Sequence, residues 1–207
     1  MRASVDKYIG VAVVVAAVAL AVPASAYPPA VGILGRSENC LACHVNNGPW
    51  TDEGKTLIDV LDKETGESLR QDDGSFLIEA KRGQARTVLT VIGRTKDDTA
   101  PAPYRNAWIY VAPAERDNGS PSSAKFAPSW AVNLPMACRI VGDEMEGFEG
   151  ARITALPMTV RPLDGARDAE LELQVMLTRG ESVKGDPAKG MKGNCFERTV
   201  LLRVMDD

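Results

Sequence analysis

Residues 170–175, Glu-Leu-Glu-Leu-Gln-Val, decide the fold class, because polar and apolar side chains alternate there one by one. Successive side chains of a β-strand point to opposite faces of a sheet, so the alternation predicts a strand with one buried and one solvated face. An amphipathic helix would instead repeat its apolar residues every three or four positions. We therefore expect a sheet that packs its apolar face against a second layer.

Further strands are predicted on both sides of this stretch, from apolar and β-branched runs separated by turn sequences. These runs cover residues 56–62, 67–71, 75–81, 87–94, 107–111, 137–141, 151–160 and 196–205. Short strands at this spacing predict a mainly β fold, an antiparallel immunoglobulin-like sandwich. We expect a single domain over residues 27–207, with a mobile loop at 113–128 and one short helix over residues 40–45.

The first 26 residues are expected to be a signal peptide. Arg2 and Lys7 precede an apolar run over residues 9–22, and Ala24-Ser25-Ala26 fits the small-residue cleavage rule. A retained anchor is the alternative, but 14 helical residues reach only about 21 Å, against a hydrocarbon core of about 30 Å. We therefore expect a periplasmic or secreted protein with no membrane span after cleavage.

Composition excludes several classes of function. The chain of 207 residues carries a formal net charge of −4, so nucleic acid, which needs clustered Lys and Arg, is not an expected partner. It contains one histidine, which excludes a bis-histidine haem or a metal site with two imidazoles from this chain.

The pattern Cys40-Leu41-Ala42-Cys43-His44 is the one specific chemical motif. Two thiols three positions apart on one helical turn can add to the two vinyl groups of haem, and the following histidine can bind the iron, so this pattern predicts one haem c. A redox disulfide would be expected in a βαβ setting, which does not precede the motif. Structural zinc would need further ligands that adjacent Cys43 and His44 do not easily complete, and a histidine beside a structural disulfide is the third alternative.

On these residues the chain resembles the c-type cytochromes. The resemblance implies that Cys40 and Cys43 form the haem thioethers and that His44 is the proximal iron ligand. Because the C-terminal residues 196–205 are predicted to form a strand, the chain departs from the small helical cytochromes c. It is more similar to β-rich cytochromes c, which include the His/Cys-ligated haem proteins of anaerobic ammonium oxidisers.

The sixth iron ligand is left open between a methionine, a cysteine, a lysine and an empty position. Met136 and Met158 each follow a proline, and we expect Met136 to bind, with Met158 and Cys138 as alternatives. Cys138 and Cys195 are otherwise expected to form a disulfide, the default in an oxidising compartment.

These features predict an exported monohaem cytochrome that transfers electrons, alone or as the haem subunit of a redox complex, to a partner protein. We expect an electron carrier rather than an enzyme, because a peroxidase usually needs a distal histidine. The alternative is a haem protein that binds or senses NO or CO, with Cys or an open position as its distal site. The sequence does not fix the oligomeric state.

Overall fold

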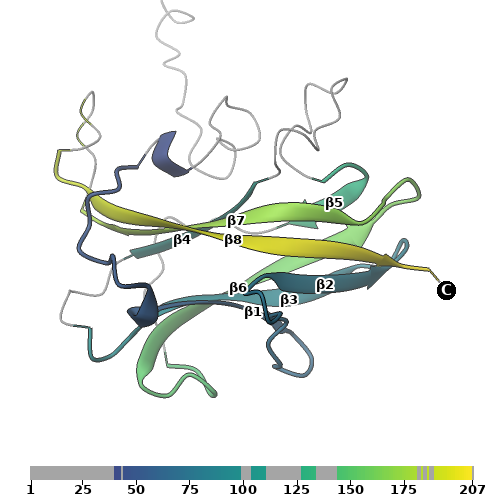
Figure 1. Cartoon of the computed structure of the whole chain (residues 1–207), viewed down its shortest axis with the longest axis horizontal. Helices are drawn as coiled ribbons and strands as arrows, with labels where there is room; N and C mark the ends of the chain where they lie inside the picture. Colours follow the sequence, from purple (N-terminus) through teal and green to yellow (C-terminus); the bar gives the residue numbers. More distant parts are fainter. Residues whose placement is uncertain are drawn as a thin grey trace, which may run out of the picture.

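Eight strands form two four-stranded sheets in the computed structural model, which describes residues 40–42, 44–98, 104–110, 127–133, 144–180, 183, 186 and 189–206. The first sheet has the order β1-β3-β6-β5 and the second has the order β2-β8-β7-β4. The strands are β1 (Thr56–Asp62), β2 (Phe76–Lys81), β3 (Arg86–Thr95), β4 (Tyr104–Tyr110), β5 (Trp130–Asn133), β6 (Ala151–Pro162), β7 (Ala169–Arg179) and β8 (Lys192–Met205). The two sheets lie one above the other as a sandwich (Figure 1), so the predicted mainly β sandwich is confirmed.

The alternation at residues 170–175 sets the inner face of β7, as predicted. Leu171, Leu173 and Val175 are fully buried in the core between the sheets. On the other face Glu170 is exposed, but Gln174 is only 1% exposed. The face that was predicted to be solvated is therefore closed to solvent at Gln174. The turn at Cys40 covers it, because Cys40 N donates a hydrogen bond to Gln174 Oε1 at 2.9 Å.

Strand pairing is antiparallel except at one edge. β2 and β8 run parallel, with Phe76 opposite Val200, whereas β7 and β8 pair antiparallel over eleven positions from Ala169 to Arg179. The second sheet is therefore mixed, which the antiparallel prediction did not include. Parallel pairing has no turn to mark it in the sequence, since it joins strands that are far apart along the chain.

Several predicted strand boundaries change in the structure. Residues 67–71 make only isolated bridges, Leu61 with Ser68 and Arg70 with Phe76, instead of a full strand. β4 starts at Tyr104 and β8 at Lys192, in stretches predicted as loops, and β5 was not predicted. The predicted strand at 137–141 lies outside the described residues, as do residues 1–39 with the predicted signal peptide and residues 113–126 of the predicted mobile loop.

Helical structure in the described part of the chain is limited to two single 3₁₀ turns, η2 (Cys40–Ala42) and η3 (Glu53–Lys55). η2 lies on the outer side of the sheet that contains β7 and β8, and the chain then passes around the end of that sheet to η3 and β1 (Figure 1). The short helix predicted at residues 40–45 is thus a tight turn on the sheet surface.

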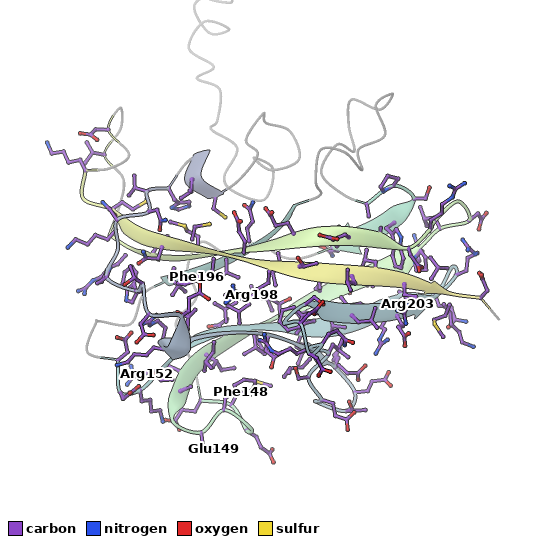
Figure 2. The ribbon with its side chains drawn as sticks, in the orientation of Figure 1. Phe148, Glu149, Arg152, Phe196, Arg198 and Arg203 are labelled. Atoms are coloured by element: carbon purple, nitrogen blue, oxygen red, sulfur yellow. The ribbon has the colours of Figure 1, made fainter. Side chains whose placement is uncertain are left out.

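A second, smaller apolar cluster lies on the outer face of the first sheet. Its buried members come from the neighbouring strands β1, β3 and β6; they are Leu61, Val91, Ala151 and Ile153. Met145 and Phe148 pack against this cluster from the preceding loop, where Figure 2 shows Phe148 beyond the sheet. Both sheets therefore have part of their outer face covered by a loop segment.

Candidate haem-binding site

The motif begins in a tight turn that brings His44 back toward Cys40. η2 starts at Cys40, and His44 N donates a hydrogen bond to Cys40 O at 3.0 Å. Cys40 is 6% exposed and sits against β7, held by the hydrogen bond from its amide to Gln174 Oε1. Cys43 lies outside the described residues. The turn is therefore docked on the sheet at its first residue.

The segment after the motif, residues 45–50, is hydrogen-bonded to the start of β8 through side-chain amides. Asn46 Oδ1 accepts hydrogen bonds from Cys195 N at 3.2 Å and from Asn194 Nδ2 at 3.3 Å. Asn194 Oδ1 in turn accepts from the buried Trp50 N at 2.8 Å. Residues about 150 positions apart thus form one hydrogen-bonded unit, so the motif is fixed relative to the last strand.

Two glycines let the segment and β8 approach closely. Gly48 N donates to Gly193 O at 2.7 Å. A Cβ atom on Gly193 would lie 2.4 Å from Met176 Cε and 2.8 Å from Val45 O, which is inside van der Waals contact. Glycine is required at position 193 because the space that a side chain would take is filled on both sides.

His44 is half-buried beside a methionine sulfur. Its Nδ1 lies 3.2 Å from Sδ of Met191, a residue only 9% exposed. Burial lowers the pKa of His44, so the imidazole is held in the neutral form, which is the form that binds metals. The turn therefore presents an uncharged nitrogen ligand.

A second sulfur group lies next to the motif on β8. Phe196, labelled in Figure 2, belongs to the core between the sheets, so its neighbour Cys195 faces the outer side, opposite Met176 of β7. The neighbouring Cys195 thiol and burial raise the pKa of Cys40, whereas the Cys40 thiol lowers the pKa of Cys195. Cys195 is therefore the thiol of the pair that ionises first.

The predicted ligands and disulfide are placed only in part. Met136 and Cys138 lie outside the described residues, so their distance from His44 and from Cys195 is not shown. Met158 is fully buried in the main core on β6, opposite Val88 of β3. Its sulfur is thus enclosed between the two sheets.

Met191 was not among the predicted site residues, although the sequence carried a signal for it. The stretch Lys189-Gly190-Met191-Lys192-Gly193 has the composition of a hairpin loop and lies before the predicted strand at 196–205. Residues 191, 193 and 195 nevertheless follow the two-residue period of a strand, so a strand beginning earlier would have placed Met191 and Cys195 on one side.

The donor set suits covalently attached haem. Neutral imidazole and thioether sulfur are both ligands of haem iron, and the Cys40 thiol can form a thioether to the cofactor. In the described part of the chain no group of three or more His, Cys, Asp or Glu side chains gathers as a metal site. His44 and Cys40 are thus the described residues that would hold haem, with Cys43 adjoining them in the motif.

Comparison with known proteins returned no family: no protein-family model matches the chain, and no curated protein sequence matches it. Within the described residues, no helix has the length and apolar character needed to cross a membrane.

Proposed function

We propose that this protein is an exported monohaem c-type cytochrome that transfers single electrons, alone or within a redox complex. The observation that carries the proposal is the Cys40–His44 turn, docked on the sheet with a neutral, half-buried imidazole at its end. When bound, the haem would supply an iron that cycles between its ferric and ferrous states.

The chain's own residues have distinct parts in this function. Cys40 and Cys43 would anchor the group by thioether bonds, and His44 would bind the iron. Met176 and Gln174 keep the sheet beneath the turn closed to water, since both are buried on the outer face of β7. These two buried side chains would hold His44 in one position during oxidation and reduction. Electron exchange would then be fast, because few protein atoms would have to rearrange.

A charged surface beside the turn suits a protein partner. Lys189 and Lys192 are exposed on either side of the buried Met191. Exposed like charges steer an oppositely charged partner and raise its association rate at low salt. The partner that fits this surface is an acidic redox protein, and electron exchange with it should slow as ionic strength rises.

The test is to express the full chain in a host that matures c-type haem and to measure the intact mass. We expect one added haem that survives denaturing electrophoresis, and an N-terminus at Tyr27. Cys40→Ala and Cys43→Ala should each weaken retention, whereas Cys195→Ala, the matched control outside the motif, should leave attachment unchanged. A protein without added haem mass would refute the proposal.

The absorption spectrum separates a carrier from a gas-binding protein. A six-coordinate ferrous haem that reacts slowly with CO is the expected result. Rapid CO binding, without displacement of a protein ligand, would refute electron transfer as the main function and support the NO- or CO-binding alternative.

A further inference from the structure

The contact between His44 and Met191 involves Nδ1 of the imidazole, so it bears on which ring nitrogen carries the proton. His44 Nδ1 lies 3.2 Å from Met191 Sδ. A thioether sulfur carries no hydrogen and accepts only weakly, so the contact is a hydrogen bond only when Nδ1 carries the proton. Nε2 then has its lone pair free.

Met191 is held in this position by the residues around it. Its carbonyl accepts a hydrogen bond from Asn47 Nδ2 at 3.5 Å, and Asn47 Oδ1 accepts from Gly193 N at 3.3 Å. The side chain of Met191 is buried although Lys189 and Lys192 beside it are exposed. The sulfur is therefore fixed against the motif rather than free in solvent.

We propose that Met191 is a positioning residue for the iron ligand His44: its sulfur accepts the Nδ1 proton and leaves Nε2 to bind the metal. This role rests on the proposed function. In metal sites the ligating histidine donates its second N–H to a carboxylate, a carbonyl or water, which sets the ring orientation and raises the basicity of the ligand. A thioether is a weaker acceptor than these, so His44 would be a less basic ligand, which favours ferrous over ferric iron.

The first experiment uses the haem-free full chain, so that its result is independent of haem attachment. Because the chain has one histidine, ¹⁵N-histidine labelling reports on His44 alone. At a pH where the ring is uncharged, the wild type is expected to show a protonated Nδ1 and an unprotonated Nε2. Met191→Leu, which keeps the bulk and removes the acceptor, should shift the ring toward the Nε2–H form that imidazole favours in water.

Two variants complete this experiment. Met191→Gln restores an acceptor through its amide oxygen and should retain the Nδ1–H form. Met205→Leu makes the same change at an exposed methionine near the other end of β8 and should have no effect. A wild-type ring protonated at Nε2, or one that Met191→Leu leaves unchanged, would overturn the proposal even if haem attaches.

The second experiment measures the haem-loaded protein. Met191→Gln, with its stronger acceptor, should shift the midpoint potential to more negative values, while the number of iron ligands stays the same. Conversion of Met191→Leu to a high-spin form that binds CO rapidly would show that Met191 is itself the sixth ligand, and would overturn the positioning role. Absence of haem from every variant would refute the proposed function and leave the tautomer result standing.

Discussion

Replacing Gly193 with alanine tests how closely the motif segment is packed on β8. The added Cβ would meet Met176 Cε at 2.4 Å, Val45 O at 2.8 Å and Leu177 O at 3.2 Å. The methionine methyl can move, but the two carbonyl oxygens belong to the backbone of the segment and of β7. Overpacking of this kind typically costs about 1–3 kcal/mol.

The structure also supplies the control. Gly54→Ala places a Cβ 3.2 Å from Oδ1 of the exposed Asp52, which caps η3 by accepting from Gly54 N at 2.9 Å and has to shift by only a few tenths of an ångström. Its change in the free energy of unfolding is expected to stay within about 0.5 kcal/mol. Comparing Gly193→Ala with Gly54→Ala therefore isolates the packing of the motif segment from the general effect of replacing glycine.

Thermal and urea unfolding of the haem-free chain, followed by circular dichroism, measure both variants. A cost near 2 kcal/mol for Gly193→Ala corresponds to a fall in Tm of roughly 4–8 °C for a chain of this size. Site-resolved alkylation of the native protein gives a second measurement, because lifting the segment would expose the Cys40 thiol, which is only 6% exposed. Equal stability and equal Cys40 labelling in Gly193→Ala and Gly54→Ala would refute the proposed packing.

Two other predictions concern acid stability and the sixth ligand. Arg86 holds the pKa of Asp62 down to about 2, so the pair stabilises the fold at pH values above the unfolded pKa of about 3.9, and this contribution is lost as the pH falls toward 2. Asp62→Asn should remove that part of the acid-unfolding curve measured by fluorescence. An unchanged curve would contradict the assignment. In the haem-loaded protein, Met136→Leu should abolish the long-wavelength band of methionine-ligated ferric haem. Met158 is buried in the core, so Met158→Leu should leave the band in place and lower the free energy of unfolding by less than about 1.5 kcal/mol. A band that survives Met136→Leu would remove Met136 as the ligand.

The inner face of the sandwich was predictable because it depends on local sequence. Leu171, Leu173 and Val175 alternate with polar residues, and the structure buries all three. The outer face was not predictable from the same stretch, because Gln174 is buried by a segment more than 130 positions away. A polar residue that a distant segment buries has the same neighbours in the sequence as a polar residue that is exposed to solvent.

The candidate residues of the motif, from Cys40 to His44, could be chosen from their spacing alone. Their surroundings could not be predicted, because these depend on packing between distant segments. Met191 lies between lysines and glycines that favour a loop, and its place beside His44 depends on contacts between segments 147 positions apart. Similarly, the Cys195 thiol changes the pKa of the Cys40 thiol, an influence that the sequence argument did not consider because Cys40 was assigned to haem.

The position of the motif segment implies that the site forms late in folding. The segment contacts the start of β8, the last strand in the chain, through Asn46, Gly48 and Trp50. β8 itself needs β7 on one side and the early strand β2 on the other, since it pairs with both. Contacts this far apart in sequence carry a large loop-closure entropy and therefore tend to form slowly. Until β8 has paired, His44 has no Met191 beside it and Cys40 has no cover, so the imidazole and the thiol acquire their buried environments only when both ends of the fold have come together.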